Sequence, residues 1–243
     1  MLRRLYAFFF VSIFFVNKVF AQNIIVGVHY SPPWSYVNNN GEIVGIEKEI
    51  IEGAFEKRGY NVEFKIYGYS RLIKEITDKK VDFASPIAVN IPNILPVDHY
   101  LPFHDVAMTL KSRDLKVDNV SDLKGKAVVA YQKASYVLGD EYRNVVESNT
   151  ELYKEIHGRE NQIQMLFRGR TDIVVGEERI LVYLSEKLYG PGKVSIHPIF
   201  QKTNYGGAAW SESLVNDFNR GLEVLKNSGE YQEMLDKHRS IEQ

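Results

Sequence analysis

Residues 44–59 read VGIEKEIIEGAFEKRG, and this stretch decides the fold class. It predicts an amphipathic helix from Glu47 to Arg58, because its apolar side chains recur at helical spacing. Gly59 follows, where a helix commonly ends in a left-handed residue. Strand-like stretches flank this helix on both sides, at 23–28 and 62–66. A strand, a helix and a strand in succession indicate an α/β unit.

The same alternation continues along the chain. Apolar runs predict strands at 82–84, 106–110, 127–130 and 172–175. Helical spacing predicts helices at 70–77 (with Ser70 as N-cap), 136–147, 159–168 and 178–187, and a tail from 213 to 238 broken near 228–229. Three prolines preclude a regular helix within 91–103. The pattern predicts two α/β lobes with largely parallel strands.

Composition excludes several classes of protein. The 243 residues include 30 basic and 31 acidic side chains, for a formal net charge of −1, which gives no electrostatic case for nucleic-acid binding. The chain has no cysteine, so disulfides, thiolate metal sites, cysteine nucleophiles and a lipid-modified amino-terminal cysteine are excluded.

The first 21 residues have the pattern of a secretory signal peptide. Arg3 and Arg4 precede an apolar run, and the segment closes with Val19, Phe20 and Ala21. The run is too short to span a bilayer, which takes roughly 20 residues. We expect cleavage after Ala21 and export to the periplasm; an uncleaved anchor is the alternative.

Six stretches, in this order, carry a family likeness: 44–50, 69–73, 80–83, 123–126, 169–175 and 218–231. Together they resemble family 3 extracellular solute-binding proteins, the substrate receptors of polar amino acid ABC transporters. The resemblance implies a type II periplasmic binding fold. The first lobe would comprise 22–107 plus 205–243, and the second 108–204. The lobes would hinge near Ala107 and Met108 and again over 202–205, where Gly206 and Gly207 help to absorb the dihedral change.

Aromatic residues are the first candidates for ligand contacts. Tyr30 and Trp34 lie on a diproline loop after the first strand, and their flat faces suit an apolar or cationic ligand. Tyr69 occupies the position at which the resemblance places the other half of an aromatic clamp. The alternative is ordinary burial, with Trp34 under its loop as a core residue.

The resemblance also assigns polar contacts in the first lobe to Ser85, Pro86 and Ile87, and it exposes a departure. Receptors of this family usually continue into a stretch whose arginine holds the ligand's α-carboxylate in a bidentate fork. This chain has no basic residue between Val81 and Asp98. Either the ligand lacks a standard α-carboxylate or another cation substitutes. Arg71 is the nearest candidate, and a structural arginine on the lobe surface is the alternative.

In the second lobe the candidates are Ser135 and Glu177. Ser135 begins a helix after a strand, where free amides bind anions. Glu177 stands where the family's carboxylate binds the ligand's α-amino group; the alternative is that it only favours the start of the next helix.

These residues predict a solute receptor that closes around a small polar, amine-bearing ligand, an amino acid or a relative, and delivers it to an ABC permease in the inner membrane. We expect a monomer with no cofactor, no metal site and no catalytic residue. Two alternatives stay open: a sensing module with a separate membrane partner, and a dehydratase-like enzyme with Glu177 as general acid.

Overall fold

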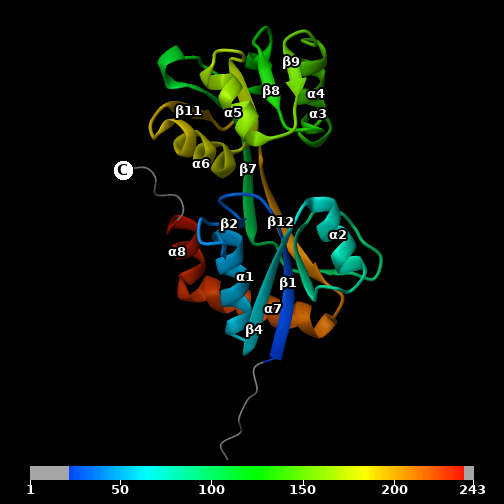
Figure 1. The fold of residues 1–243 in the computed structure, drawn as a ribbon. Coiled ribbons are helices and arrows are strands. Elements are labelled where there is room, and N and C mark those ends of the chain that lie inside the picture. The colour runs from blue at the N-terminus through cyan, green and yellow to red at the C-terminus, as the bar shows by residue number, and fades with distance from the viewer. Residues whose placement is uncertain (1–21, 238–243) are drawn as a thin grey trace, which may run out of the picture.

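The computed structural model describes residues 22–237. The predicted signal peptide lies outside the described residues. Figure 1 shows two lobes joined by two long strands, β7 (Leu101–Leu110) and β12 (Lys202–Ala209). None of the helices between residues 22 and 237 has the length and apolarity that crossing a bilayer requires.

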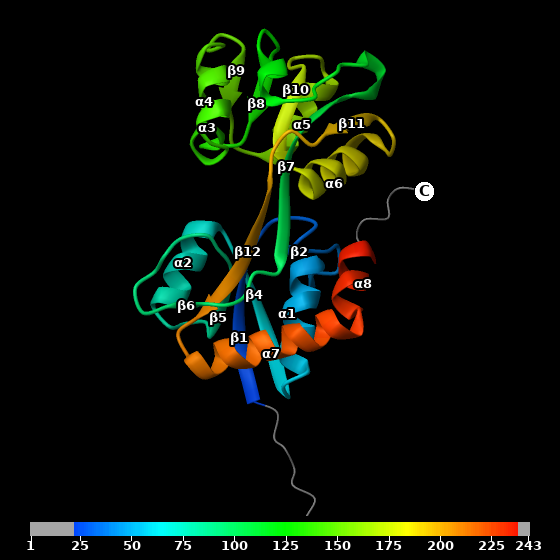
Figure 2. The same ribbon diagram turned by 180° about the vertical axis from the view of Figure 1, so that it is seen from behind.

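The first lobe is built on a sheet in the order β4-β1-β5-β12. Strands β1, β4 and β5 are parallel, with Val26 of β1 opposite both Phe64 and Phe83, and β12 runs antiparallel to β5. Helices α1 and α7 pack against each other beside this sheet, with α8 following α7 (Figure 2). The elements of the lobe are β1 (Gln22–His29), β2 (Tyr36–Val37), β3 (Ile43–Val44), α1 (Ile46–Glu56), β4 (Tyr60–Tyr67), α2 (Tyr69–Thr77), β5 (Phe83–Ile87), β6 (Leu95–Pro96), α7 (Glu212–Ser228) and α8 (Glu230–Lys237).

The second lobe is built on the order β7-β10-β8-β9, with β11 on the other side of β7. Strands β8, β9 and β10 are parallel to one another, whereas β7 is antiparallel to both of its neighbours, β10 and β11. The elements are the 3₁₀ helices η1 (Lys111–Arg113) and η2 (Val120–Leu123), then β8 (Val128–Ala130), α3 (Ala134–Val137), α4 (Asp140–Glu147), β9 (Tyr153–Glu155), α5 (Arg159–Phe167), β10 (Ile173–Glu177), α6 (Glu178–Tyr189) and β11 (Val194–His197).

The link between the lobes is a two-stranded antiparallel ribbon. Residues 101–104 of β7 pair with 202–205 of β12, after which β7 continues into the second sheet and β12 into the first. Ala107 and Met108 already pair with β10 and β11. We therefore propose that the outward crossing between the lobes lies at 101–104, a few residues before the predicted position.

Most elements match the expectations from sequence, with three corrections. Helix α2 begins after Gly68 rather than Ser70, because the extended backbone of Gly68 precedes the first turn. The single helix predicted at 136–147 is two, divided at Gly139 by a φ of 92°. The strand predicted at 106–110 starts at Leu101, where β12 supplies its partner.

Gly207 has a packing role that the sequence did not indicate. A Cβ at this position would lie 2.4 Å from the Phe83 ring and 2.8 Å from the carbonyl oxygen of Ala84. Neither Gly206 nor Gly207 has a positive φ. Gly207 therefore allows β12 to lie close against β5, a role distinct from the hinge flexibility predicted for it.

Candidate functional site

The two lobes meet where a strand of each ends. The indole Nε1 of Trp34, on the loop after β1, donates a hydrogen bond of 3.2 Å to Oε2 of Glu177, the last residue of β10. Both side chains are buried. The carboxyl ends of parallel strands, together with the helix N-termini that follow them, are the usual ligand edge of an α/β sheet. This contact therefore joins the ligand edges of the two lobes.

Glu177 is held in place by the helix that it caps. Its Oε2 also accepts a hydrogen bond of 2.9 Å from the backbone N of Ile180, in the first turn of α6. Burial raises the pKa of Glu177 to about 7, although these hydrogen bonds favour the ionised form. The carboxyl group thus exchanges its proton near neutral pH, at the junction of the lobes.

A second carboxylate lies directly opposite. Asp105 of β7 pairs in register with Glu177, and Tyr131 Oη donates to Asp105 Oδ2 over 3.3 Å. Burial raises the pKa of Asp105, while the nearby Arg159 lowers it. The guanidinium of Arg159 lies 4.5 Å from the centroid of the Tyr131 ring. Asp105, Tyr131 and Arg159 therefore form a charged cluster beside Glu177.

None of these three residues was among the candidates predicted from sequence, although signals for two of them were present. Tyr131 directly follows the strand predicted at 127–130, and Arg159 is the first residue of a predicted helix, so both belong to the ligand edge. Asp105 lies before the predicted start of its strand. Only the pairing of β7 with β10 shows that it faces Glu177.

The predicted aromatic residues differ in their surroundings. Tyr30 is 53% exposed. Tyr69 packs edge-on against His29, with ring centroids 5.7 Å apart, and its hydroxyl accepts a 3.1 Å hydrogen bond from the backbone N of Ala88. Trp34 is enclosed against Phe103, at 4.7 Å between ring centroids. Tyr30 thus has an open face, whereas Trp34 occupies the interior position that the sequence analysis kept as the alternative.

Two of the four residues predicted to make ligand contacts in the first lobe, Ser85 and Arg71, have side-chain partners inside the protein. Ser85 is fully buried, and its Oγ lies 2.5 Å from the hydroxyl oxygen of Tyr100. Pro86 and Ile87, at the end of β5, are partly exposed. Arg71 is largely exposed, and its Nε lies 2.6 Å from Oε1 of Glu75 in an ion pair within α2. Ligand contacts at these four positions stay predictions.

The amides around Ser135 are occupied by an internal carboxylate. Oε1 of Glu155 accepts from the backbone N and from Oγ of Ser135, at 2.8 and 2.7 Å, and Oε2 accepts from the backbone N of Lys133 at 2.6 Å. Glu155 thus takes the place that the sequence analysis assigned to a bound anion. A ligand contact at Ser135 also stays a prediction.

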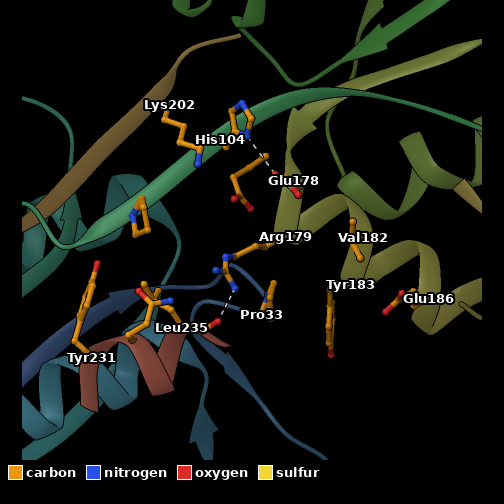
Figure 3. Close-up of a pocket in the computed structure, with 13 residues that line it drawn as sticks. Pro33, His104, Glu178, Arg179, Val182, Tyr183, Glu186, Lys202, Tyr231 and Leu235 are labelled. Carbon is orange, nitrogen blue, oxygen red and sulfur yellow. Dashed lines mark hydrogen bonds and ion pairs between the residues drawn. The ribbon is translucent and has the colours of Figure 1, made fainter. Parts of the chain in front are cut away.

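A pocket of about 370 Å³ opens between α6 of the second lobe and α8 of the first. Figure 3 shows its charged lining, which includes Lys202 and a hydrogen bond between His104 and Glu178. Arg179 also lines the pocket, and its Nη1 donates to the carbonyl oxygen of Leu235 over 2.9 Å. The pocket therefore includes a further contact between the lobes. Within residues 22–237 no group of three or more His, Asp or Glu side chains is placed to hold a metal ion.

Two α/β lobes on a two-stranded ribbon, with polar groups gathered where their strand ends meet, define the class of two-lobed binding proteins. A family model places the chain further: residues 24–240 match the bacterial extracellular solute-binding proteins, family 3, and the chain belongs to that family.

Individual relatives agree with this assignment. The chain is 27% identical over 227 residues to an arginine-binding periplasmic protein of Mannheimia haemolytica, covering 89% of this chain and 91% of that protein. It is also 27% identical to a putative sensor protein of Shewanella frigidimarina, covering 90% of this chain and 33% of that longer protein. Among solved structures, an ancestral cationic amino acid solute-binding protein superposes with a TM-score of 0.71 at 19% identity, over 89% of this chain and 95% of that one. This last likeness shows the fold alone.

Proposed function

We propose that this protein is a periplasmic receptor that closes around a small polar, amine-bearing ligand, an amino acid or a relative, and delivers it to the permease of an ABC transporter. One observation carries the proposal: Glu177 and Asp105 stand opposite each other at the junction of the lobes, and Trp34 of the other lobe bonds to Glu177. Two carboxylates favour a ligand with a positively charged nitrogen. Contacts from both lobes favour a closed form when the ligand is bound.

Further support comes from the relatives. An arginine-binding protein of Mannheimia and an L-cystine-binding protein of Bacillus subtilis both align over most of the chain. Of the residues predicted to contact the ligand, we propose that Tyr30 and Tyr69 supply aromatic faces from the first lobe and Glu177 supplies a carboxylate from the second. Delivery to a permease and export through a cleaved signal peptide are part of this proposal.

A screen by thermal shift, followed by calorimetry, tests the proposal. Twenty amino acids, a set of amines and a set of small uncharged and anionic solutes are added separately to the protein lacking residues 1–21. A ligand at a hundred times its Kd stabilises the native state by about 2.7 kcal/mol, which such a screen detects. Binding of an amino acid supports the proposal; binding only of uncharged or purely anionic solutes contradicts it.

Two other activities stay open for this protein. A sensing role with a separate membrane partner is favoured by the putative sensor protein of Shewanella, which contains a matching segment. Neighbouring genes separate the two roles, since a transporter predicts a permease and an ATPase and a sensor predicts a histidine kinase. We propose binding without turnover. A product formed from any bound ligand would instead assign Glu177, with its pKa of about 7, the role of a general acid.

A further inference from the structure

One cation at the junction of the lobes carries an unused hydrogen-bond donor. Nη1 of Arg159 is fully enclosed and has no hydrogen-bond partner among residues 22–237. A charged donor that is removed from water without a partner destabilises the protein that contains it. Buried donors of this kind are rare in native proteins, and one beside a ligand edge points to a role in binding.

The surroundings hold the guanidinium in this place. Its central carbon, Cζ, lies over the Tyr131 ring, at 4.5 Å from the ring centroid. A Cβ at Gly176 would lie 3.2 Å from Nη1, so the glycine leaves the room that the guanidinium fills. Arg159 as a whole is partly exposed, so solvent reaches the residue although Nη1 is covered.

Arg159 also acts electrostatically on the first lobe. Its positive charge adds to burial in lowering the pKa of His29, the last residue of β1. Burial lowers the pKa of Arg159, whereas the nearby Asp105 and Glu177 raise it and so favour the charged form. One positive group thus lies beside two carboxylates, which is the charge pattern complementary to the carboxylate and ammonium of a zwitterion.

We infer that Arg159 binds the ligand's carboxylate, with Glu177 and Asp105 facing its ammonium group. This inference rests on the proposed function and identifies the ligand as an α-amino acid. A planar guanidinium matches a carboxylate with two parallel hydrogen bonds. The competing anion sites are occupied: Arg71 pairs with Glu75 on the surface, and Glu155 fills the amides before α3.

The assignment has a consequence for the order of binding. Both charged ends of the amino acid would be held by the second lobe and by β7 at its edge. The first lobe would then close with its aromatic residues, Tyr30 and Tyr69, over the ligand. Charge recognition would precede closure.

The test compares ligands that differ only in the α-carboxylate: arginine with agmatine, and lysine with cadaverine. Calorimetry on the wild-type protein is expected to show binding of the amino acid at least tenfold tighter than that of its decarboxylated partner. Arg159→Gln is expected to weaken binding of the amino acid by at least tenfold. It should leave the affinity for the amine within about twofold of the wild-type value, because only the carboxylate contact is removed. Arg159→Lys retains the positive charge but cannot make two parallel hydrogen bonds. Its preference for the carboxylate should therefore lie between those of the wild-type protein and Arg159→Gln.

Three further variants keep the test decisive. Arg168→Gln, which changes an exposed arginine at the other end of α5, is the matched control and should leave the preference for the carboxylate unchanged. Arg71→Gln tests the rival cation. Gly176→Ala leaves Arg159 in the chain and crowds Nη1, so it should reduce the same preference even where Arg159→Gln fails to fold. A wild-type preference that survives Arg159→Gln or Gly176→Ala, or that disappears in Arg71→Gln, overturns the assignment. So does a wild-type protein that binds both members of a pair equally well. A wild-type protein that binds no member of either pair and no amino acid overturns the proposed function itself.

Discussion

Trp34 Nε1 and Glu177 Oε2 lie 3.2 Å apart, although the two residues are separated by 143 positions in the chain. The bond joins the loop after the first strand of one lobe to the last strand residue of the other. It is enclosed on both sides, so water does not compete for the donor. Its strength depends on the charge of Glu177, because a hydrogen bond to an ionised acceptor is roughly twice as strong as one to a neutral acceptor.

The first prediction follows from this dependence. Trp34→Phe retains a ring against Phe103 and removes the N–H donor, so it should lower the free energy of unfolding by about 1–3 kcal/mol. Urea denaturation at pH 5.5 and pH 8.5 measures the loss. The loss should be greater at pH 8.5, where Glu177, with a pKa of about 7, is ionised. An equal loss at both pH values would show that the bond does not depend on this charge.

The second prediction concerns Glu47, a buried acid in the core of the first lobe. Its Oε2 accepts from Ser35 Oγ at 2.7 Å, and its Oε1 has no hydrogen-bond partner among the described residues. Burial raises its pKa from 4.5 to about 7, whereas the nearby Ser85 and Ser35 hydroxyls lower it. The folded state therefore holds a proton that the unfolded state has released. The contribution of Glu47 to stability is therefore fully present below pH 4.5 and is lost as the pH rises through about 7.

Glu47→Gln removes this dependence. The variant should gain about 3 kcal/mol over the wild-type protein between pH 4.5 and pH 8, at 1.36 kcal/mol for each unit of the shift. Urea melts across this range provide the measurement. Glu177 titrates in the same window and contributes equally to both proteins, so the difference between the two curves isolates Glu47. If the free energies of unfolding of the two proteins differ by the same amount at every pH, the pKa of Glu47 is not raised.

Repeating patterns in the sequence were enough to predict the alternating elements. The period of 3.6 residues in 47–58 and the apolar runs at 127–130 and 172–175 are local signals, and each corresponds to an element of the structure. The break of a helix at Gly139 was not predicted, because it depends on a positive φ that the residue type permits but does not require. The early start of β7 was missed because it depends on a partner strand about a hundred residues later.

In the candidate site, too, contacts between distant segments could not be predicted from sequence. Glu177 was identified from the family resemblance, at the position where the family's carboxylate binds the ligand's amino group. Its bond to Trp34 was not predicted, because nothing in either segment specifies a contact between the lobes. Arg159 was overlooked as an ordinary first residue of a helix. Its unpartnered Nη1 becomes visible only when Gly176 and Tyr131 are placed around it.

The third prediction tests the packing of α1 on α7. A Cβ at Gly221 would lie 1.9 Å from the carbonyl oxygen of Ala54, a contact that requires the helices to separate. Gly221→Ala should therefore destabilise the protein by about 3 kcal/mol. Gly68→Ala is the control, because nothing lies within 4 Å of the added carbon, and it should change stability by less than about 1 kcal/mol. Similar urea midpoints for the two variants would show that the helices are not in close contact.

The fourth prediction separates binding from folding. Tyr30 is 53% exposed, so Tyr30→Ala should leave stability nearly unchanged. If its ring covers the ligand, the same change should weaken binding by about 3- to 30-fold. Val224→Ala, a comparable exposed apolar position on α7, should affect neither quantity. Calorimetry with the ligand found by the screen gives the affinities; an unchanged Kd in Tyr30→Ala removes this residue from the site.

Closure of the two lobes around a ligand would shorten the distance between them, and that distance can be measured. The chain has no cysteine, so Lys80→Cys in the first lobe and Glu151→Cys in the second provide two unique label positions, both exposed. Single-molecule energy transfer or pulsed electron resonance then reports the separation with and without the amino acid identified by the screen. The account predicts a shorter distance at saturating ligand. An unchanged distance, in a sample for which calorimetry shows that the site is filled, would contradict it.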